Sequence, residues 1–391
     1  MIISVANRLK ITNEYYFSVK LQEVKTMMDQ GIDVMNIAIG NPDMSPSAST
    51  IKTLQDEAGK TGNHGYQPYR SIPQLREAIS KWYNHTYHVS LNSNTEILPL
   101  IGSKEGIAHI SLAFLNEGDS VLVPELGYPA YRAVTEMLGG KTITYPMVEH
   151  EGWRPDFEAM EKQDLSAIKL MWINYPNMPT GAPASSEIFE KLVEFAHKHK
   201  ILLCHDNPYS LVLNEGDPLS LLSIDGAKEV AIELNSMSKS HNMAGWRIGW
   251  ISGDSSYIDA ILKIKSNVDS GMFKPMQLAA ATALSNPESW HKERNQIYKK
   301  RRTLVYQILD HLQCSYSTNQ VGMFIWAQIP AHVPSGELLI EYLLHKHHIF
   351  VAPGFIFGEK GDRYIRISLC IDEQIIREVV DRVKNIDLTN I

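Results

Sequence analysis

Short apolar runs alternate with amphipathic segments through the middle of the 391-residue chain. The segments 104–115 and 186–199 place apolar residues at helical spacing, with polar residues on the opposite face. Apolar runs rich in β-branched residues separate such segments, and we expect strands at 96–101, 120–124, 168–174, 201–205, 230–234 and 246–252. Near-continuous apolar strands that alternate with helices are typical of a mostly parallel sheet covered on both faces. The pattern therefore predicts an α/β fold.

The pattern changes after about residue 255. A long helical stretch is expected to run to about Arg302, and a smaller mixed region follows it. In that region we expect strands at 323–328 and 364–368, a helix at 336–347 and a last helix from about residue 372. The first 35 residues look helical and irregular, and we expect them to pack against this region.

These patterns predict two domains that share a tight interface. The large domain, residues 38–280, is expected to carry a mostly parallel, seven-stranded sheet. The smaller α+β domain is expected to combine residues 281–391 with an N-terminal arm, residues 1–37.

Composition and charge narrow the classes of function. Hydrophobic residues make up 44% of the chain and charged residues 21%, as in ordinary soluble globular proteins. The formal net charge of −7 argues against bulk binding to nucleic acid or to an anionic membrane. The densest basic run, Lys299–Arg302, falls in a helical pattern and is expected to form a solvated helix face. We therefore expect neither nucleic acid nor a membrane as a partner.

The cysteines and histidines favour neither a disulfide framework nor a metal site. Three cysteines are widely spaced, which fits reduced thiols and a cytoplasmic location: Cys204, Cys314 and Cys370. No run of about 18 apolar residues is present that could cross a membrane. Two groups of histidines lie in Lys-rich amphipathic helices without acidic partners, at 197 and 199 and at 345, 347 and 348. We expect these helix faces to be solvated and predict no metal ion.

Chemically useful residues directly follow several predicted strands, at the edge of the sheet where ligands bind in open α/β folds. A Gly-Ser turn at 102–103 opens a helix, which suits a phosphate because the first N–H groups of a helix are free to donate. Arg247 is able to grip the same phosphate with two hydrogen bonds. Lys239, in a buried setting, is a candidate amine nucleophile.

Two further residues complete this set. Asp206 follows a strand, and an acid in that position can keep a ring nitrogen protonated. Tyr128 offers a flat face on which a ring can stack. A phosphate site, a partner for a cationic ring nitrogen, a stacking face and a reactive amine together describe a site for pyridoxal phosphate.

The stretch Ser236–Gly249, Ser-Met-Ser-Lys-Ser-His-Asn-Met-Ala-Gly-Trp-Arg-Ile-Gly, resembles the Schiff-base lysine signature of the class I/II, or fold type I, aminotransferases. Other motifs match the family in order: Tyr66-Gln67-Pro68-Tyr69 before Leu75-Arg76, the run 124–129, and Ala352-Pro353-Gly354. The resemblance covers nearly the whole chain. The stretches 102–109 and 233–249 look closest to the branch that contains LL-diaminopimelate and related bacterial aminotransferases.

The resemblance implies a fold type I pyridoxal-phosphate enzyme with assigned roles for four residues around the cofactor ring. Lys239 would carry the cofactor as a Schiff base and then move the proton at the substrate α-carbon. Asp206 would pair with the pyridine nitrogen, Tyr209 would hydrogen-bond the ring oxygen O3′, and Tyr128 would stack on the ring.

The resemblance also implies how the phosphate and the substrate are held. The phosphate contacts would come from Ser103, Lys104, Ser236, Arg247 and Tyr66 of the partner subunit. The active unit is therefore expected to be a homodimer with shared active sites. Arg366 would bind the substrate α-carboxylate, with the backbone of Gly40 beside it.

One position departs from the family pattern. The family usually has Asn immediately before Pro-Thr-Gly, in contact with O3′ and with the substrate carboxylate, whereas this chain has Met178. A thioether is a weak acceptor and cannot donate a hydrogen bond. Either Asn174 or Asn177 makes the missing contact, or O3′ relies on Tyr209 alone.

The implied reaction is a ping-pong transfer of an amino group from an L-amino acid to a 2-oxo acid. A pyridoxal-phosphate-dependent C–S β-lyase is an alternative, because the same carbanion can eliminate a leaving group. A non-catalytic pyridoxal-phosphate-binding regulatory protein is another, and the full set of predicted cofactor contacts disfavours it. The sequence leaves the identity of the amino acid open.

Overall fold

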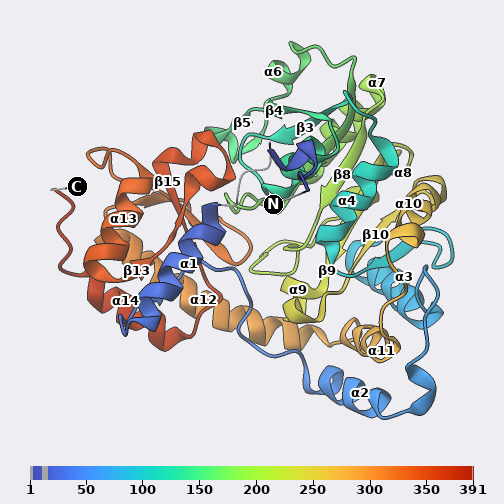
Figure 1. Cartoon of the computed structure of the whole chain (residues 1–391), viewed down its shortest axis with the longest axis horizontal. Coiled ribbons are helices and arrows are strands. Elements are labelled where there is room, and N and C mark those ends of the chain that lie inside the picture. The colour runs from blue at the N-terminus through green and yellow to red at the C-terminus, as the bar shows by residue number, and fades with distance from the viewer. Residues whose placement is uncertain (1–2, 11–15, 390) are drawn as a thin grey trace.

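A seven-stranded sheet forms the centre of the larger part of the molecule in the computed structural model, which describes residues 3–10, 16–389 and 391 (Figure 1). The strands, in spatial order, are Ile97–Leu100 (β2), Gly249–Gly253 (β10), Ala231–Ser236 (β9), Leu202–Asp206 (β8), Ile168–Ile173 (β7), Ser120–Pro124 (β3) and Lys141–Tyr145 (β4). β10 runs antiparallel to β2 and β9, and the other neighbouring strands are parallel. The predicted α/β fold with a mostly parallel sheet is therefore confirmed.

Two strands differ from the sequence prediction for local reasons. β10 begins at Gly249, later than expected, because residues Ala244–Trp246 form a 3-10 turn and Arg247 adopts a φ of 54°. β4 was not predicted at all. It lies at the edge of the sheet, and its side chains are mostly exposed or half-buried, so no apolar run marks it.

Alternate residues of the central strands enter two separate cores. On β8, Leu202 and Cys204 pack with helices Ser103–Phe114 (α4), Ala130–Met137 (α5) and Ser255–Val268 (α10). Leu203 faces the other way, into the core that holds helices Pro73–Tyr87 (α3) and Ser186–His199 (α7). Because side chains alternate along a strand, neighbouring polar residues of β8 also point to opposite faces.

The long helical stretch expected up to Arg302 is three helices: α10, Lys274–Ala283 (α11) and Glu288–His311 (α12). Between α10 and α11, Gly271 forms a β-bridge with Gln67, and an added Cβ would lie 2.5 Å from a backbone oxygen of that loop. Pro275 begins α11 and Pro287 caps α12. Continuous helical periodicity hid these breaks.

The smaller part of the molecule is built on a four-stranded sheet, with strands Ser315–Tyr316 (β11), Phe324–Gln328 (β12), Tyr364–Ser368 (β15) and Ala352–Pro353 (β14) in spatial order. Helices Gly336–His347 (α13) and Glu373–Val383 (α14) accompany it. Near the N-terminus, Met35–Asn36 (β1) pairs in parallel with Ile349–Phe350 (β13). This two-stranded sheet, separate from the four-stranded one, joins the early part of the chain to the smaller part of the molecule. The division into domains at 37/38 and 280/281 stays a prediction.

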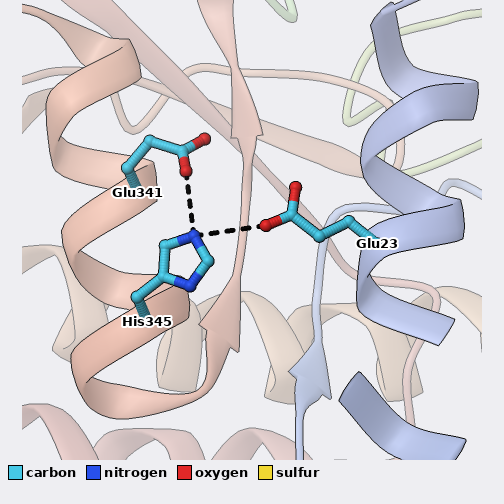
Figure 2. Close-up of side chains that lie close together, drawn as sticks. All are labelled: Glu23, Glu341 and His345. Atoms are coloured by element: carbon cyan, nitrogen blue, oxygen red, sulfur yellow. Dashed lines mark hydrogen bonds and ion pairs between the residues drawn. The ribbon is translucent and has the colours of Figure 1, made fainter. Parts of the chain in front are cut away.

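Helix Tyr16–Asp29 (α1) is bonded to α13 by a charged cluster (Figure 2). His345 Nε2 lies 3.2 Å from Glu23 on α1 and 3.1 Å from Glu341 on its own helix. Lys20 pairs with the same two carboxylates. The prediction of an exposed helix face holds for His345, but the prediction that it has no acidic partner was wrong, since Glu341 is one turn away and Glu23 comes from a distant segment. It was also wrong for His199, which lies 3.0 Å from Glu161.

Helix α12 begins near α9, Met237–Ser240, and extends into the smaller part of the molecule (Figure 1). Near its start, Arg294 donates to the backbone oxygens of Ser240 and Leu211. Two helical turns further on, Arg301 donates two hydrogen bonds of 2.7 Å to Asp43 and one of 3.0 Å to the Leu369 oxygen. Arg301 is only 4% exposed, so the prediction of a solvated basic face was wrong for this residue.

The remaining elements are short or peripheral: Asn7–Lys10 (η1), Ala48–Ala58 (α2), Thr61–Asn63 (η2), Met147–Val148 (β5), Glu149–Glu151 (η3), Arg154–Pro155 (β6), Phe157–Glu161 (α6), Leu221–Ser223 (η4), Ala227–Val230 (α8), Gly354–Phe357 (η6) and Glu359–Arg363 (η7). The 3-10 turn Ala244–Trp246 is η5. In the part of the chain that the structure describes, no helix combines the length and apolar character that crossing a membrane requires.

Candidate active site

A cavity of about 300 Å³ lies at the carboxyl edge of the parallel strands. Its lining includes every residue that the sequence assigned to the site except Tyr66 and Asn177: Gly40, Ser103, Lys104, Tyr128, Asn174, Asp206, Tyr209, Ser236, Lys239, Arg247 and Arg366. The parallel order of the sheet explains this convergence, since the loops that follow β2, β3, β7, β8 and β9 open at one edge. β10 runs in the opposite direction, so its start, next to Arg247, reaches the same edge.

The start of α4 is shaped for a phosphate. Gly102 has a φ of +80°, and an added Cβ would lie 2.3 Å from the guanidinium of Arg247. Gly249 permits a second close approach, because a Cβ there would lie 2.6 Å from the Ser103 nitrogen. No side chain of the described residues caps this helix, so its first N–H groups face the cavity beside a guanidinium. This combination fits an anion with several oxygens.

Lys239 sits on the short helix α9 with its amine in the cavity. Its Nζ donates to the backbone oxygen of Gly40 at 2.5 Å. Burial lowers the pKa of the Lys239 ammonium, and the charges of Arg366 and Arg247 lower it as well. A lysine with a lowered pKa reaches the neutral, nucleophilic form more readily.

Asp206 ends β8 and presents a carboxylate to the cavity. Tyr131 donates to its Oδ2 at 2.8 Å, whereas Oδ1 has no hydrogen-bond partner among the described residues. Burial raises the pKa of Asp206 to about 6, against the effects of the Tyr131 hydrogen bond and the charge of His205. An orphaned, buried carboxylate oxygen fits a cationic ring nitrogen, which would both hydrogen-bond it and stabilise its charge.

Tyr131 was missed by the sequence analysis. Its ring stacks on Trp172 with a centre-to-centre distance of 4.8 Å, and it lies in the first turn of α5, whereas Tyr128 precedes the helix. Its closeness in sequence to Tyr128 was the available signal.

The loop after β7 holds itself together with its own amides. Asn174 donates to the Asp206 backbone oxygen at 2.6 Å and accepts from the Met178 N–H at 2.7 Å. Asn177 accepts from both the N–H and the hydroxyl of Thr180. Asn177 therefore holds the turn and does not line the cavity, contrary to the sequence-based prediction.

Burial raises the pKa of Tyr209, which keeps its phenol protonated and able to donate.

Arg366 lies between two aromatic rings. Its guanidinium is 3.8 Å from the ring centre of Phe324 and 4.5 Å from that of Phe357. It donates to the Ala38 oxygen at 3.2 Å and to the sulfur of Met178 at 3.1 Å. Met178, which stands where the family usually has Asn, thus contacts Arg366, the residue predicted to bind the substrate carboxylate. The sequence did not predict this contact.

Tyr66 is 95% exposed and does not line the cavity of its own chain. Its loop is held by the bridge from Gln67 to Gly271. Two more apolar side chains near this bridge, Val268 and Phe273, are 63% and 40% exposed. Exposed apolar side chains gathered in this way are typical of a protein–protein contact.

Two groups of side chains could offer ligands to a metal ion within the described residues: Glu23, Glu341 and His345, and Glu105, His109 and Asp269. In each group a lysine already pairs with an acid, Lys20 in the first and Lys265 in the second. The absence of a metal ion stays a prediction.

Comparison with known proteins gives consistent results. Residues 32–383 match the family model described as "Aminotransferase class I and II". The chain is 37% identical to the LL-diaminopimelate aminotransferase of Halothermothrix orenii, over 98% of each chain. It is 39% identical to the enzyme of that name from Natranaerobius thermophilus, over 97% of this chain and 98% of the relative. The solved structure of apo-BacF from Bacillus subtilis superimposes with a TM-score of 0.95 at 34% identity and covers 99% of both chains.

Proposed function

The chain belongs to the class I and II aminotransferase family, and we propose that it attaches pyridoxal phosphate at Lys239 and transfers an amino group from an L-amino acid to a 2-oxo acid. The observation that carries this proposal is the convergence of Lys239, Asp206 and Arg366 on one cavity beside the α4 turn. The cofactor requires a reactive amine and a partner for its ring nitrogen, which Lys239 and the unbonded oxygen of Asp206 would supply. The amino acid requires a ligand for its carboxylate, which the guanidinium of Arg366 would supply.

When bound, pyridoxal phosphate supplies an aldehyde that condenses with amines and a protonated ring that withdraws electrons from the substrate α-carbon. The first N–H groups of α4, the Ser236 hydroxyl and the Arg247 guanidinium would hold the phosphate. Asp206 would keep the ring nitrogen protonated through its free Oδ1. Tyr209, still protonated, would donate to O3′, and the second N–H of Asn174 remains available beside it, since only one is bonded to the Asp206 oxygen.

Lys239 has two tasks in this proposal. It holds the cofactor between turnovers, and its amine would then take the proton from the substrate α-carbon and pass it to the cofactor, or the reverse in the second half of the reaction. Its lowered pKa suits both tasks, because a neutral amine is needed for nucleophilic attack and for proton abstraction.

Arg366 would bind the substrate α-carboxylate in an apolar setting. The rings of Phe324 and Phe357 cover the guanidinium and exclude water from it, which strengthens its attraction to an anion. The thioether of Met178 is a weak acceptor, so it holds the guanidinium in place without competing strongly with a carboxylate.

The active form is proposed to be a homodimer in the cytoplasm. The apolar surface around Tyr66 and Phe273 supports a second copy as partner, and the three buried, unpaired cysteines support a reducing compartment. In the dimer, Tyr66 of the partner subunit would complete the phosphate site. Mixing Tyr66→Ala with Lys239→Ala protein should then restore activity, because each mixed dimer contains one intact site. Activity that stays absent after subunit exchange would contradict site sharing.

The activity test uses the absorption spectrum of the purified protein loaded with pyridoxal phosphate. A panel of L-amino acids is added, starting with LL-diaminopimelate because the similar curated proteins bear that name. One amino acid should change the spectrum, and a 2-oxo acid should reverse the change. Lys239→Ala should abolish this response, whereas Lys263→Ala, on the exposed side of α10, should preserve it. Release of pyruvate and ammonia without a 2-oxo acid would instead identify a β-lyase.

A further inference from the structure

A buried pair of ionisable residues lies directly behind Asp206. His205 on β8 and Glu233 on β9 are neighbours in the parallel register, and both are 0% exposed. They face the core of α3 and α7, on the opposite side of the sheet from the Asp206 side chain, which bonds with Tyr131 of α5. Neither residue lines the cavity, and neither has a part in the proposed mechanism so far.

Glu233 is surrounded by hydrogen-bond donors. The hydroxyls of Tyr83 and Ser220 donate to it at 2.8 and 2.9 Å, and the Leu221 N–H donates at 3.0 Å. His205 Nδ1 lies 2.8 Å away. A carboxyl group whose oxygens meet donors from every side is in its ionised form, which has only acceptor positions.

His205 therefore has an acceptor at each ring nitrogen. The ionised Glu233 requires a proton on Nδ1. On the other side, Nε2 lies 2.9 Å from the backbone oxygen of Tyr175, which only accepts, while the Tyr175 N–H points at the same nitrogen from 3.4 Å. Phe189 closes the site, with its ring edge-on to the imidazole at 5.0 Å. The shorter contact at each ring nitrogen is to an acceptor, which favours a proton on both nitrogens and a positive charge on the ring.

We propose that His205 is a positioning residue, held as an imidazolium by Glu233, whose positive charge keeps Asp206 ionised for the cofactor ring nitrogen. The inference rests on the role of Asp206 in the proposed function. Asp206 is also faced by the phenols of Tyr128, Tyr131 and Tyr209 and, across the cavity, by Lys239. Behind the sheet, the charge of His205 offsets part of the burial that favours the protonated acid.

The test uses the full-length protein freed of cofactor, with unfolding by urea measured across pH. The pKa of Asp206 is about 6 in the folded protein against an ordinary 3.8, so the folded state binds this proton more tightly than the unfolded chain. The unfolding free energy should therefore fall as the pH rises from about 4 to about 6. Asparagine does not titrate, so the difference between wild type and Asp206→Asn reports the pH at which Asp206 loses its proton.

The same difference is then measured in a His205→Asn and in a Glu233→Gln background. In both, the midpoint should move to higher pH by up to about one unit, because loss of the positive charge behind the sheet favours the protonated acid. Phe189→Leu disturbs the same packing without changing charge and should leave the midpoint unmoved. A midpoint that stays in place in both backgrounds overturns the proposal.

A second measurement does not depend on variants that fold poorly. Nitrogen NMR of isotope-labelled histidine in the cofactor-free wild type should show protons on both ring nitrogens of His205 at neutral pH. A bare ring nitrogen overturns the proposal. Failure of the proposed function gives a different result: Asp206→Asn would then bind pyridoxal phosphate and turn over normally, while the proton linkage between His205 and Asp206 persists.

Discussion

Replacement of Tyr131 by phenylalanine is the most direct test of how the protein controls Asp206. The variant keeps the ring that stacks on Trp172 and loses the hydroxyl that donates to Asp206 Oδ2 at 2.8 Å. A hydrogen bond to a charged group contributes about 1.5–3 kcal/mol, and one pKa unit corresponds to about 1.36 kcal/mol. Loss of this bond should therefore raise the pKa of Asp206 by about 1–2 units.

The direction of the effect follows from the charge of the acid. Asp206 must be ionised to hold a protonated ring nitrogen, and its pKa is about 6 in the protein without cofactor. Affinity for pyridoxal phosphate should therefore weaken as the pH falls through about 6 in the wild type. In Tyr131→Phe the weakening should begin at a pH about 1–2 units higher, with little difference between the proteins at high pH.

The assay is equilibrium binding of pyridoxal phosphate at a series of pH values. Ionisation of the cofactor itself is common to all proteins, so it cancels when profiles are compared. Tyr145→Phe is the matched control, because it removes another buried phenol that bonds to the Trp172 oxygen at 3.0 Å away from the cavity lining. Superimposable profiles for Tyr131→Phe and the wild type would refute the reasoning.

Three further substitutions test other parts of the site and the fold. Arg366→Lys removes a planar guanidinium, and kcat/KM should fall by roughly 10–100-fold while cofactor affinity is retained, as steady-state kinetics would show. Gly102→Ala places a Cβ 2.3 Å from Arg247 at a φ of +80°, so cofactor affinity in a binding titration should fall by about tenfold or more. Arg301→Met removes the hydrogen bonds from a buried guanidinium to the exposed Asp43 and should lower the free energy of urea unfolding by about 1.5–3 kcal/mol.

Matched control variants exist for Gly102→Ala and Arg301→Met. Gly62→Ala meets nothing within 4 Å and should bind the cofactor normally. Lys300→Ala, on the exposed face beside Arg301, should leave stability within about 0.5 kcal/mol of the wild type. An Arg366→Lys enzyme with unchanged kcat/KM, or an Arg301→Met protein of full stability, would show that the observed contacts do not carry these roles.

The sequence predicted the cavity well because parallel strands bring their following residues to one edge. Asp206 and Lys239 come from different strands, yet each could be placed from strand position alone. Residues outside the strand ends were harder to predict. Tyr131 in α5 contacts Asp206, and Phe357 in η6 packs on Arg366, through tertiary contacts that periodicity does not reveal.

The errors in the sequence analysis arose where a partner comes from a distant segment. Arg301 looked like one more cation of a basic run, but Asp43, far away in the sequence, buries it. His345 is exposed, as predicted, yet Glu23 from a distant segment pairs with it. Asn177 differs, because its partner Thr180 is only three residues away and a local turn uses its side chain. Periodicity and spacing carry no information about such tertiary pairings.

Helix α12 has a consequence for how the protein melts. Through Arg294 it holds the oxygen of Ser240, next to Lys239, and through Arg301 it holds Asp43 and the end of β15. A single rigid element thus crosses between the two sheets and is fixed by buried charges at both. Neither sheet can open while the other stays intact without exposing one of these arginines. Calorimetry should therefore record one cooperative transition for the chain. Amide hydrogen exchange in the two sheets should change in parallel when the stability of the protein is changed.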